Sequence, residues 1–361
     1  MILQDNNVES KEIKNIYEHN YINQIWKGKI NLNDGEFHNH SLFICYLCLE
    51  HLILCDDNCE TNQVQTCKNY VQKAIIESIQ IFYSTSFPRS CKCTQNRISC
   101  ETEDIWLQKQ LGIVFFNYSK NDIQPRKLHP AVFPIDLPKY FISLLTHEND
   151  VILDPFGGTG TTALAALLLN RIPISIDLSQ NYSDFALERI KKHKFTNKFL
   201  ILNGNTHDIS KLLHNESINL ILTSPPYANL LNKEITHRSR INRNRDITPR
   251  QYSQDEADLG ILDLDTYLSN VHALFTTLYE KLKNNGHVII NVCNDIYDKS
   301  TGKTYQFPSK IITIMEEIGF IYKNKIIWDR TKFYSNAHIF GYPSNFMIFS
   351  GSYEYILHFT K

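Results

Sequence analysis

From about residue 126 onward, short apolar runs alternate with helix-like patterns, and this alternation constrains the fold most. Short apolar runs fit strands that are buried on both faces, and such an alternation is typical of a mostly parallel sheet covered by helices on both sides. No helical pattern separates the last two runs, so we expect them to pair antiparallel at one sheet edge. The expected strands are 151–156, 172–177, 199–204, 218–225, 287–293, 325–330 and 353–359, and the expected helices are about 160–170, 179–194, 265–284 and 308–319.

The first third of the chain has a different character. The segments 41–54 and 69–83 have helical length and spacing, and strands are hard to find there. Eight of the nine cysteines lie between Cys45 and Cys100. We therefore expect a helical, cysteine-rich N-terminal domain at 1–125 and an α/β domain at 126–361.

A long polar insertion at 228–262 follows the fourth expected strand. Loops of this length in a compact fold are usually functional or unstructured. The formal net charge of −1 gives no indication of a nucleic-acid partner, so any attraction to phosphates must come from local clusters of this kind. A solvated loop is the alternative reading. The basic residues are Lys233, Arg238, Arg240, Arg243, Arg245 and Arg250.

A glycine-rich turn follows the first strand of the α/β domain. The strand runs into Asp154, then into Gly157, Gly158 and Gly160, and then into an apolar helix. Glycines allow a tight turn and close approach of a ligand to the helix N-terminus. A phosphate-binding loop has a lysine after its glycines, and this turn has none. The turn predicts a ligand site that is neither a phosphate loop nor a dinucleotide fingerprint, with a ligand-free tight turn as the alternative.

Polar side chains end the next two strands. Asp177 at the end of the second strand can accept both hydroxyls of a ribose, although strand-end acids also cap helices. After the third strand, either Asn205 or Asp208 can read the edge of an adenine ring. Together with the glycine turn, these positions predict a ligand of the adenosine type.

The motif Thr223-Ser224-Pro225-Pro226-Tyr227 ends the fourth strand. Two prolines stop a buried strand and hold the backbone rigid. Fixed oxygen acceptors beside an aromatic ring suit a planar base with an amino group, because the acceptors bind its N–H groups while Tyr227 stacks. A plain strand terminator with a surface tyrosine is the alternative.

DPFGGTGTT followed by TSPPY resembles the amino-methylating DNA methyltransferases, which combine an FxGxG cofactor motif with a catalytic [DNS]PP[YFW] motif. The segment 129–145 and the last two strands also resemble this family, so that the similarity covers 126–361. It implies a Rossmann-like sheet of seven strands and S-adenosylmethionine as cofactor. The implied catalytic residues are Ser224, Pro225, Pro226 and Tyr227, and the implied cofactor-binding residues are His129, Phe133, Asp154, Phe156, Gly157, Gly158, Thr159, Gly160, Thr161, Asp177, Asn205 and Thr223.

The resemblance further implies double-stranded DNA as partner, with the target base flipped out of the duplex. Serine at the start of the catalytic motif favours cytosine N4 as the methylated atom; adenine N6, a guanine amino group of RNA, and a binding protein without turnover are the alternatives. The cofactor motif precedes the catalytic motif, whereas many Ser-Pro-Pro-Tyr enzymes have the reverse order. The DNA-recognition segment is therefore open among the N-terminal third, the insertion and 333–346, and so is the presence of a cognate restriction endonuclease. The expected DNA contacts are Arg238, Arg240, Arg243 and Arg245.

Two negative expectations complete the sequence reading. Cys91, Cys93 and Cys100, with other cysteines, can supply zinc ligands, but Cys45 and Cys48 lie in an apolar pattern typical of core residues, and we expect no metal. The chain start is polar and no apolar run is long enough to cross a bilayer. We therefore expect a soluble, cytoplasmic protein of prokaryotic type with no membrane partner.

Overall fold

The computed structural model describes most of the chain from residue 75 onward, together with three strands that precede it. The earlier strands, 23–31, 37–45 and 50–55, are described by their backbone alone. After residue 75 the gaps are 77, 81, 85–87, 90, 94–97, 130, 194, 196–197, 229–256, 299–302 and 331–352.

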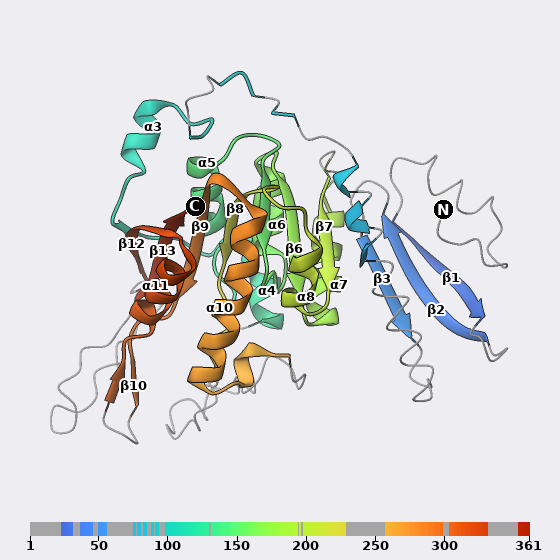
Figure 1. The fold of residues 1–361 in the computed structure, drawn as a ribbon. Helices are drawn as coiled ribbons and strands as arrows, with labels where there is room; N and C mark the ends of the chain where they lie inside the picture. Colours follow the sequence, from blue (N-terminus) through green and yellow to red (C-terminus); the bar gives the residue numbers. More distant parts are fainter. Residues whose placement is uncertain are drawn as a thin grey trace.

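An eight-stranded sheet forms the centre of the molecule (Figure 1). Its order is β4-β12-β13-β9-β8-β5-β6-β7. The strands β9, β8, β5, β6 and β7 are parallel, whereas β13 pairs antiparallel with both β9 and β12. The strands are β4 (Ile113–Val114), β5 (Val151–Asp154), β6 (Ile172–Asp177), β7 (Leu200–Asn203), β8 (Ile218–Thr223), β9 (Leu282–Val292), β12 (Ile321–Asp329) and β13 (Tyr353–Thr360).

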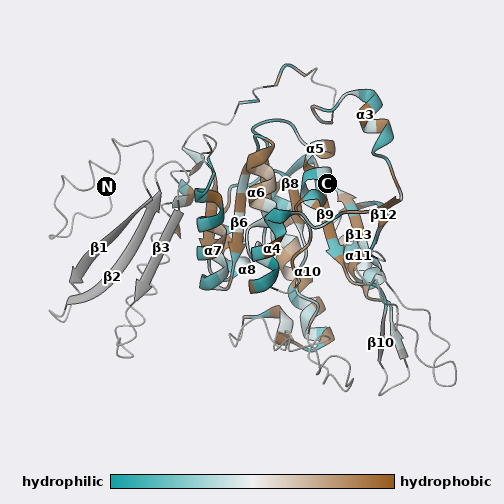
Figure 2. Cartoon of the chain, turned by 180° about the vertical axis from the view of Figure 1, so that it is seen from behind, coloured by the Kyte–Doolittle hydropathy of each residue, from teal (hydrophilic) through white to brown (hydrophobic). Residues whose placement is uncertain are grey.

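Helices cover both faces of this sheet, as the alternation predicts. One apolar core lies between the sheet and α8, α10 and α11; the other lies between the sheet and α5 and α6, with α7 packed beside α6. Figure 2 shows apolar residues along the central strands, and helices in which apolar and polar residues alternate. The longer helices are α5 (Asp136–Leu145), α6 (Thr161–Leu168), α7 (Gln180–Lys191), α8 (Thr206–Leu212), α10 (Leu264–Lys281) and α11 (Phe307–Ile318), and the shorter ones are α3 (Glu103–Gln108) and α4 (Ile123–Leu128).

Local sequence signals set the ends of several helices. The Asp263 side chain accepts hydrogen bonds from the N–H groups of Asp265 and Thr266, which starts α10. Gly319 adopts the left-handed conformation that ends α11. None of the helices in the described part of the chain is long and apolar enough to cross a membrane.

The strand order indicates at which end of the sheet a ligand is expected to bind. The chain proceeds from β5 outward through β6 to β7, and then returns to add β8 and β9 on the opposite side of β5. Ligands of open α/β sheets bind where this direction reverses, at the carboxyl ends of the strands. The reversal lies between β5 and β8, so Asp154 and Thr223, which end these strands, lie at the expected crevice.

Strands replace the helix that we expected at 41–54. β1 (Asn23–Asn31), β2 (Phe37–Cys45) and β3 (Glu50–Cys55) form a separate antiparallel sheet. The helical prediction was wrong because a continuous apolar run fits a buried helix and a pair of strands equally well. A helical conformation is confirmed at 75–76, 78–80 and 82–83, within the segment expected to be helical at 69–83.

The eighth strand also comes from the first third of the chain. β4 adds two residues parallel to β12, beyond the seven strands that we expected, and Phe116 packs into the core beneath it. Ile79 and Phe82 join the core on the other face. Residues before 126 thus contribute to the central sheet and both of its cores, and the division into domains at 125 stays a prediction.

Gly160, which precedes α6, has a conformation and a packing that exclude other residues. Its φ is 73°, and a Cβ atom there would lie 2.6 Å from Cβ of Ala186 on α7. Replacement by alanine is expected to lower the free energy of unfolding by about 2–4 kcal/mol, because left-handed backbone strain adds to overpacking. Gly158 has a φ of 50° but open space at its Cβ position, so Gly158→Ala is the matched control with about half that loss. Equal losses in urea unfolding would contradict the packing argument.

Candidate cofactor and base-binding site

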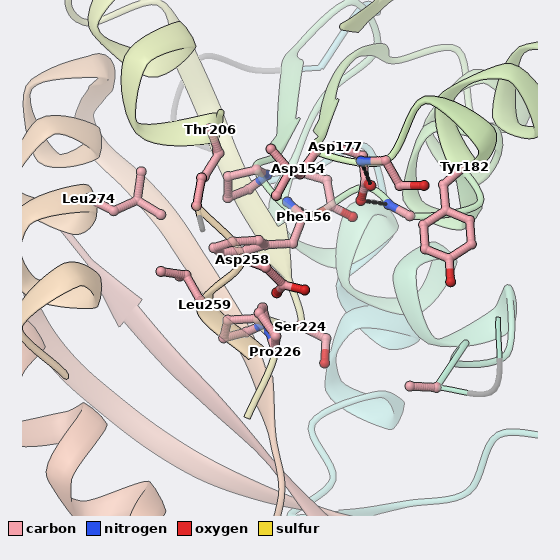
Figure 3. A pocket seen from close by; sticks show the side chains of 18 of the residues that line it. Asp154, Phe156, Asp177, Tyr182, Thr206, Ser224, Pro226, Asp258, Leu259 and Leu274 are labelled. Carbon is pink, nitrogen blue, oxygen red and sulfur yellow. Dashed lines mark hydrogen bonds between the residues drawn. The ribbon is translucent and has the colours of Figure 1, made fainter. Parts of the chain in front are cut away.

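A cavity of about 340 Å³ opens at the carboxyl ends of the parallel strands (Figure 3). It collects residues from three sequence motifs: the glycine turn after β5, the end of β6 and the Ser-Pro-Pro-Tyr segment after β8. Gly160 and Thr223 do not line it. The predicted residues that do are His129, Phe133, Asp154, Phe156, Gly157, Gly158, Thr159, Thr161, Asp177, Asn205, Ser224, Pro225, Pro226 and Tyr227.

Asp154 connects the glycine turn after β5 to the end of β8, which leads into the Ser-Pro-Pro-Tyr segment. Its Oδ2 accepts a hydrogen bond from Thr162 Oγ1 at 2.6 Å, in the first turn of α6. Its Oδ1 accepts from the Phe156 N–H at 3.1 Å and from Thr223 Oγ1 at 2.7 Å. Burial raises the pKa of Asp154 to about 6, although these hydrogen bonds oppose the rise. Thr223 therefore acts through Asp154, by joining the end of β8 to the glycine turn.

Asp177 supports the glycine turn from the neighbouring strand. Its Oδ2 accepts from the Gly158 N–H at 2.7 Å, and its Oδ1 accepts from the Ser179 N–H at 2.9 Å. Burial is the main cause that raises the pKa of Asp177 to about 6. A carboxylate oxygen has two lone pairs, so each oxygen keeps one acceptor position for a ligand hydroxyl.

Two charged residues outside the motifs fix the surrounding loops, and the sequence reading missed both. Arg189 on α7 donates to the Thr159 carbonyl at 3.2 Å and to Thr161 Oγ1 at 3.0 Å. Asp122, which is fully buried, accepts from the Ile135 N–H at 3.0 Å. Neither residue lies in a recognisable motif, because each acts on a backbone that is distant in sequence.

His129 and residues 131–133 line part of the cavity. Burial lowers the pKa of His129 to about 4, so that its imidazole is neutral near pH 7. Its ring packs edge-on against Tyr182 of α7, with the ring centroids 4.8 Å apart. Asn205 also lines the cavity, and it caps α8 by accepting from the His207 N–H. Asp208 is exposed and pairs with Lys211, so of the two alternatives Asn205 is the one at the cavity.

A polar network supports the Ser-Pro-Pro-Tyr segment from the strands behind it. Ser224 Oγ and Tyr227 OH are 3.2 Å apart, and Asn291 Nδ2 on β9 lies 3.4 Å from each. The same Nδ2 donates to Glu354 Oε2 on β13 at 2.7 Å. Glu354 is in turn paired with Arg330. The network places Ser224 Oγ and Tyr227 OH side by side. Its three supporting members could not be predicted from the sequence, because Asn291 lies in β9, Glu354 lies in β13 and Arg330 directly follows β12.

The cavity also contains polar residues that no motif predicted. Asp258, at the carboxyl end of the insertion, is 5% exposed and accepts from the Gly260 N–H at 2.8 Å. In Figure 3 Asp258 is drawn between Asp177 above and Ser224 below, and Leu259 lies toward Leu274. Thr159 Oγ1 and Thr206 Oγ1 are buried and have no hydrogen-bond partner among the described residues. Such atoms are typical of a site that a polar ligand completes.

The charge of the cavity selects among cofactors. Asp154, Asp177 and Asp258 line it, and no lysine or arginine does so among the described residues. Such a lining disfavours the anionic phosphates of a nucleotide and favours a cation. S-adenosylmethionine carries two positive groups, a sulfonium and an ammonium, and one negative carboxylate, so its net charge is positive. Its ribose hydroxyls can donate hydrogen bonds to the Asp177 carboxylate. The residues present therefore fit this cofactor.

The expected DNA contacts Arg238, Arg240, Arg243 and Arg245 lie outside the described residues, as does the segment 333–346. Their role in binding phosphates or in recognising a DNA sequence stays a prediction.

The family model described as DNA methylase, of the N6/N4 methyltransferase type, matches residues 4–188 and 218–361. Curated relatives include a type II β methyltransferase, M.BslI of a Bacillus species, which is 41% identical over 76 residues, or 21% of this chain and 8% of that protein. Type II methyltransferase M.PvuII of Proteus hauseri is 37% identical over 93 residues, or 24% of this chain and 28% of that protein. The matched parts thus span well under half the length of these relatives.

Among solved structures, TrmN from Thermus thermophilus overlaps 66% of this chain and 52% of its own, with 13% identity and a TM-score of 0.41. The family match covers most of the sequence and includes both the glycine turn and the Ser-Pro-Pro-Tyr segment. The chain belongs to the N6/N4 DNA methylase family, a family of S-adenosylmethionine-dependent methyltransferases.

Proposed function

We propose that this chain transfers a methyl group from S-adenosylmethionine to N4 of a cytosine that is flipped out of double-stranded DNA. One observation carries the proposal: a single cavity joins Asp177 and the glycine turn to Ser224 and Tyr227. The name of the matched family, which includes both N6 and N4 methylation, supports the reaction class.

At the cofactor end, the roles follow from charge and hydrogen bonding. Asp177 accepts the ribose hydroxyls, and Asn205 reads the adenine edge. The neutral His129 leaves the sulfonium without a repelling charge, and the nearby carboxylates favour it. The bound cofactor supplies an electrophilic methyl group attached to a positively charged sulfur.

At the other end, the base is held by its ring and by its amino group. Tyr227 stacks on the ring, while Ser224 Oγ and the Pro225 carbonyl accept the N–H hydrogens. The amino nitrogen is a poor nucleophile while its lone pair is delocalised into the ring. Acceptors that hold its hydrogens draw it toward a tetrahedral geometry, and they bind more strongly as the nitrogen becomes positively charged. Held in this way by Ser224 Oγ and the Pro225 carbonyl, the nitrogen would accept the methyl group that the bound cofactor supplies, and it would release one proton to water.

Serine in the first position of the motif favours cytosine over adenine in this proposal. The support is the resemblance: in the family that the motif resembles, serine at this position is associated with cytosine and aspartate with adenine. A hydroxyl can in addition donate to N3 of cytosine beside the amino group, which an ionised carboxylate cannot do. Ser224 is only half-buried and has Tyr227 OH and Asn291 as neighbours, so its hydroxyl can reorient toward a bound base.

The product tests this assignment. DNA methylated by the purified chain, digested to nucleosides and analysed by mass spectrometry, is expected to contain N4-methylcytosine. The control is the same DNA incubated without cofactor. N6-methyladenine as the sole product would contradict the choice of base while leaving the reaction class intact, and 5-methylcytosine would contradict both.

A further inference from the structure

Four potential metal ligands converge at a point away from the cofactor cavity. Cys91, Cys93 and Cys100 come from the segment before α3, and His147 comes from the turn between α5 and β5. Their ligand atoms all lie within 4.8 Å of one another. The three cysteines are free thiols that form no disulfide bond. The four residues form a set with the Cys₃His composition of structural zinc sites.

Two of the distances between ligand atoms match the spacing that a tetrahedral ion requires. With zinc–sulfur bonds of about 2.3 Å and zinc–nitrogen bonds of about 2.0 Å, neighbouring sulfur and nitrogen ligands lie roughly 3.5 Å apart. Cys91 Sγ lies 3.4 Å and Cys100 Sγ lies 3.6 Å from the same atom, Nδ1 of His147. One imidazole nitrogen has one lone pair or one hydrogen, so two thiols cannot both bond to it well. An ion at the centre of the set satisfies all four groups at once.

The surrounding contacts hold the turn that carries His147 in place. The imidazole is buried, at 1% exposed, and the His147 N–H donates to Asp150 Oδ2 at 2.7 Å. Asp150 Oδ1 lies 3.6 Å from Arg89 Nε, and Asn149 Nδ2 donates to the Pro88 carbonyl at 2.9 Å. The cysteine-bearing segment and the turn are thus joined by a second set of contacts beside the four ligands. This arrangement limits the entropy that metal binding must overcome.

The charges near the set complement a zinc–thiolate centre. Zinc with three thiolates and a neutral imidazole has a net charge of about −1. Arg171, which is 5% exposed, donates to the carbonyl and Oγ1 of Thr146, the residue next to His147. Arg89 adds a second positive charge two residues before Cys91. The positive charges of the buried Arg171 and the half-exposed Arg89 offset the negative charge of such a centre.

We propose that Cys91, Cys93, Cys100 and His147 bind one zinc ion. Four protein ligands close the coordination shell, so the site is structural and leaves no position for a substrate. His147 precedes β5, whereas Asp154 ends it. The ion therefore lies at the amino ends of the parallel strands, and the cofactor cavity lies at their carboxyl ends. The ion joins the three cysteines, which precede α3, to the turn that leads into β5. The expectation of a metal-free chain assessed these cysteines without His147, because only the fold brings that residue to them.

Elemental analysis of the full chain, purified without added metal, tests the site. We expect about one zinc per chain, and near-complete loss of zinc in both Cys93→Ser and Cys100→Ser. Cys293→Ser is the matched control, because Cys293 is a partly buried free thiol that follows β9 and should not affect zinc content. Absence of zinc, iron in its place, or full zinc content in both ligand variants would overturn the proposal.

A second measurement avoids variants that fail to fold. The wild-type chain is treated with iodoacetamide with and without a zinc chelator, and the labelled cysteines are located by peptide mass spectrometry. Cys91, Cys93 and Cys100 are expected to react at least tenfold faster after chelation, because zinc masks their thiolates. The reactivity of Cys293 should stay unchanged. Equal labelling of the three cysteines with and without chelator would contradict zinc binding.

Discussion

Tyr227→Ala is expected to lower kcat/KM for DNA methylation by roughly 5- to 150-fold, because base–aromatic stacking contributes about 1–3 kcal/mol. The ring is held edge-on by Phe307, with centroids 6.0 Å apart, so it is oriented before a base arrives. The measurement is the initial rate of methyl transfer at saturating cofactor and limiting DNA.

Tyr227→Phe separates the ring from its hydroxyl. Phenylalanine keeps the stacking surface and loses the contacts of Tyr227 OH with Ser224 and Asn291, so a loss of about 2- to 10-fold is expected. If the phenylalanine variant loses as much activity as the alanine variant, the hydroxyl network rather than stacking explains the role of Tyr227.

Asp177→Ala is expected to weaken S-adenosylmethionine binding by roughly 10- to 150-fold, or about 1.5–3 kcal/mol. The variant loses charge-assisted hydrogen bonds to the ribose, and it also frees the N–H groups of Gly158 and Ser179 that shape the glycine turn. Titration calorimetry measures the affinity. Asp177→Asn is the control, since it keeps one acceptor but no charge, and its loss should be smaller. Unchanged affinity in a folded alanine variant would remove Asp177 from the site.

The same residue predicts how binding depends on pH. Burial raises the pKa of Asp177 to about 6, and the negative charges of Asp154 and Asp258 add to the rise. Below pH 6 the carboxyl is protonated and becomes a weaker acceptor, so cofactor affinity should fall as the pH is lowered through 6. Folding has the opposite dependence. Because the pKa is raised, the folded state binds the proton more tightly than the unfolded state does, so the free energy of unfolding decreases as the pH rises from about 4 to about 6 and is constant above pH 6. In Asp177→Asn only the part due to Asp154 should remain.

The α/β part of the fold could be predicted because its signals are local. Each parallel strand is a short apolar run, and β6 begins and ends where the pattern predicts. The N-terminal strands β2 and β3 could not be distinguished from a helix, because only Glu50 and His51 interrupt the apolar residues of 42–54, a length and spacing that also fit a helix. β4 escaped notice because a strand of two residues carries no periodicity.

The residues of the candidate site also fall into two groups, those that the sequence predicted and those that only the fold brings to the site. The Asp177 side chain lies at the end of a predicted strand, and Ser224 and Tyr227 lie in a recognisable motif. Asn291 supports that motif only because β9 is adjacent to β8, a fact of topology rather than of sequence spacing. Asp258 lies in a polar insertion whose pattern predicts nothing about which residue turns inward.

Transfer of a labelled methyl group from S-adenosylmethionine tests the central claim most directly. The purified chain is incubated with the labelled cofactor and with either double-stranded DNA or RNA, beside the Tyr227→Ala variant. The account predicts label in DNA, on an exocyclic amino group, with little in RNA and less in the variant. Label in RNA alone, or equal transfer to DNA by the wild type and the variant, would contradict it.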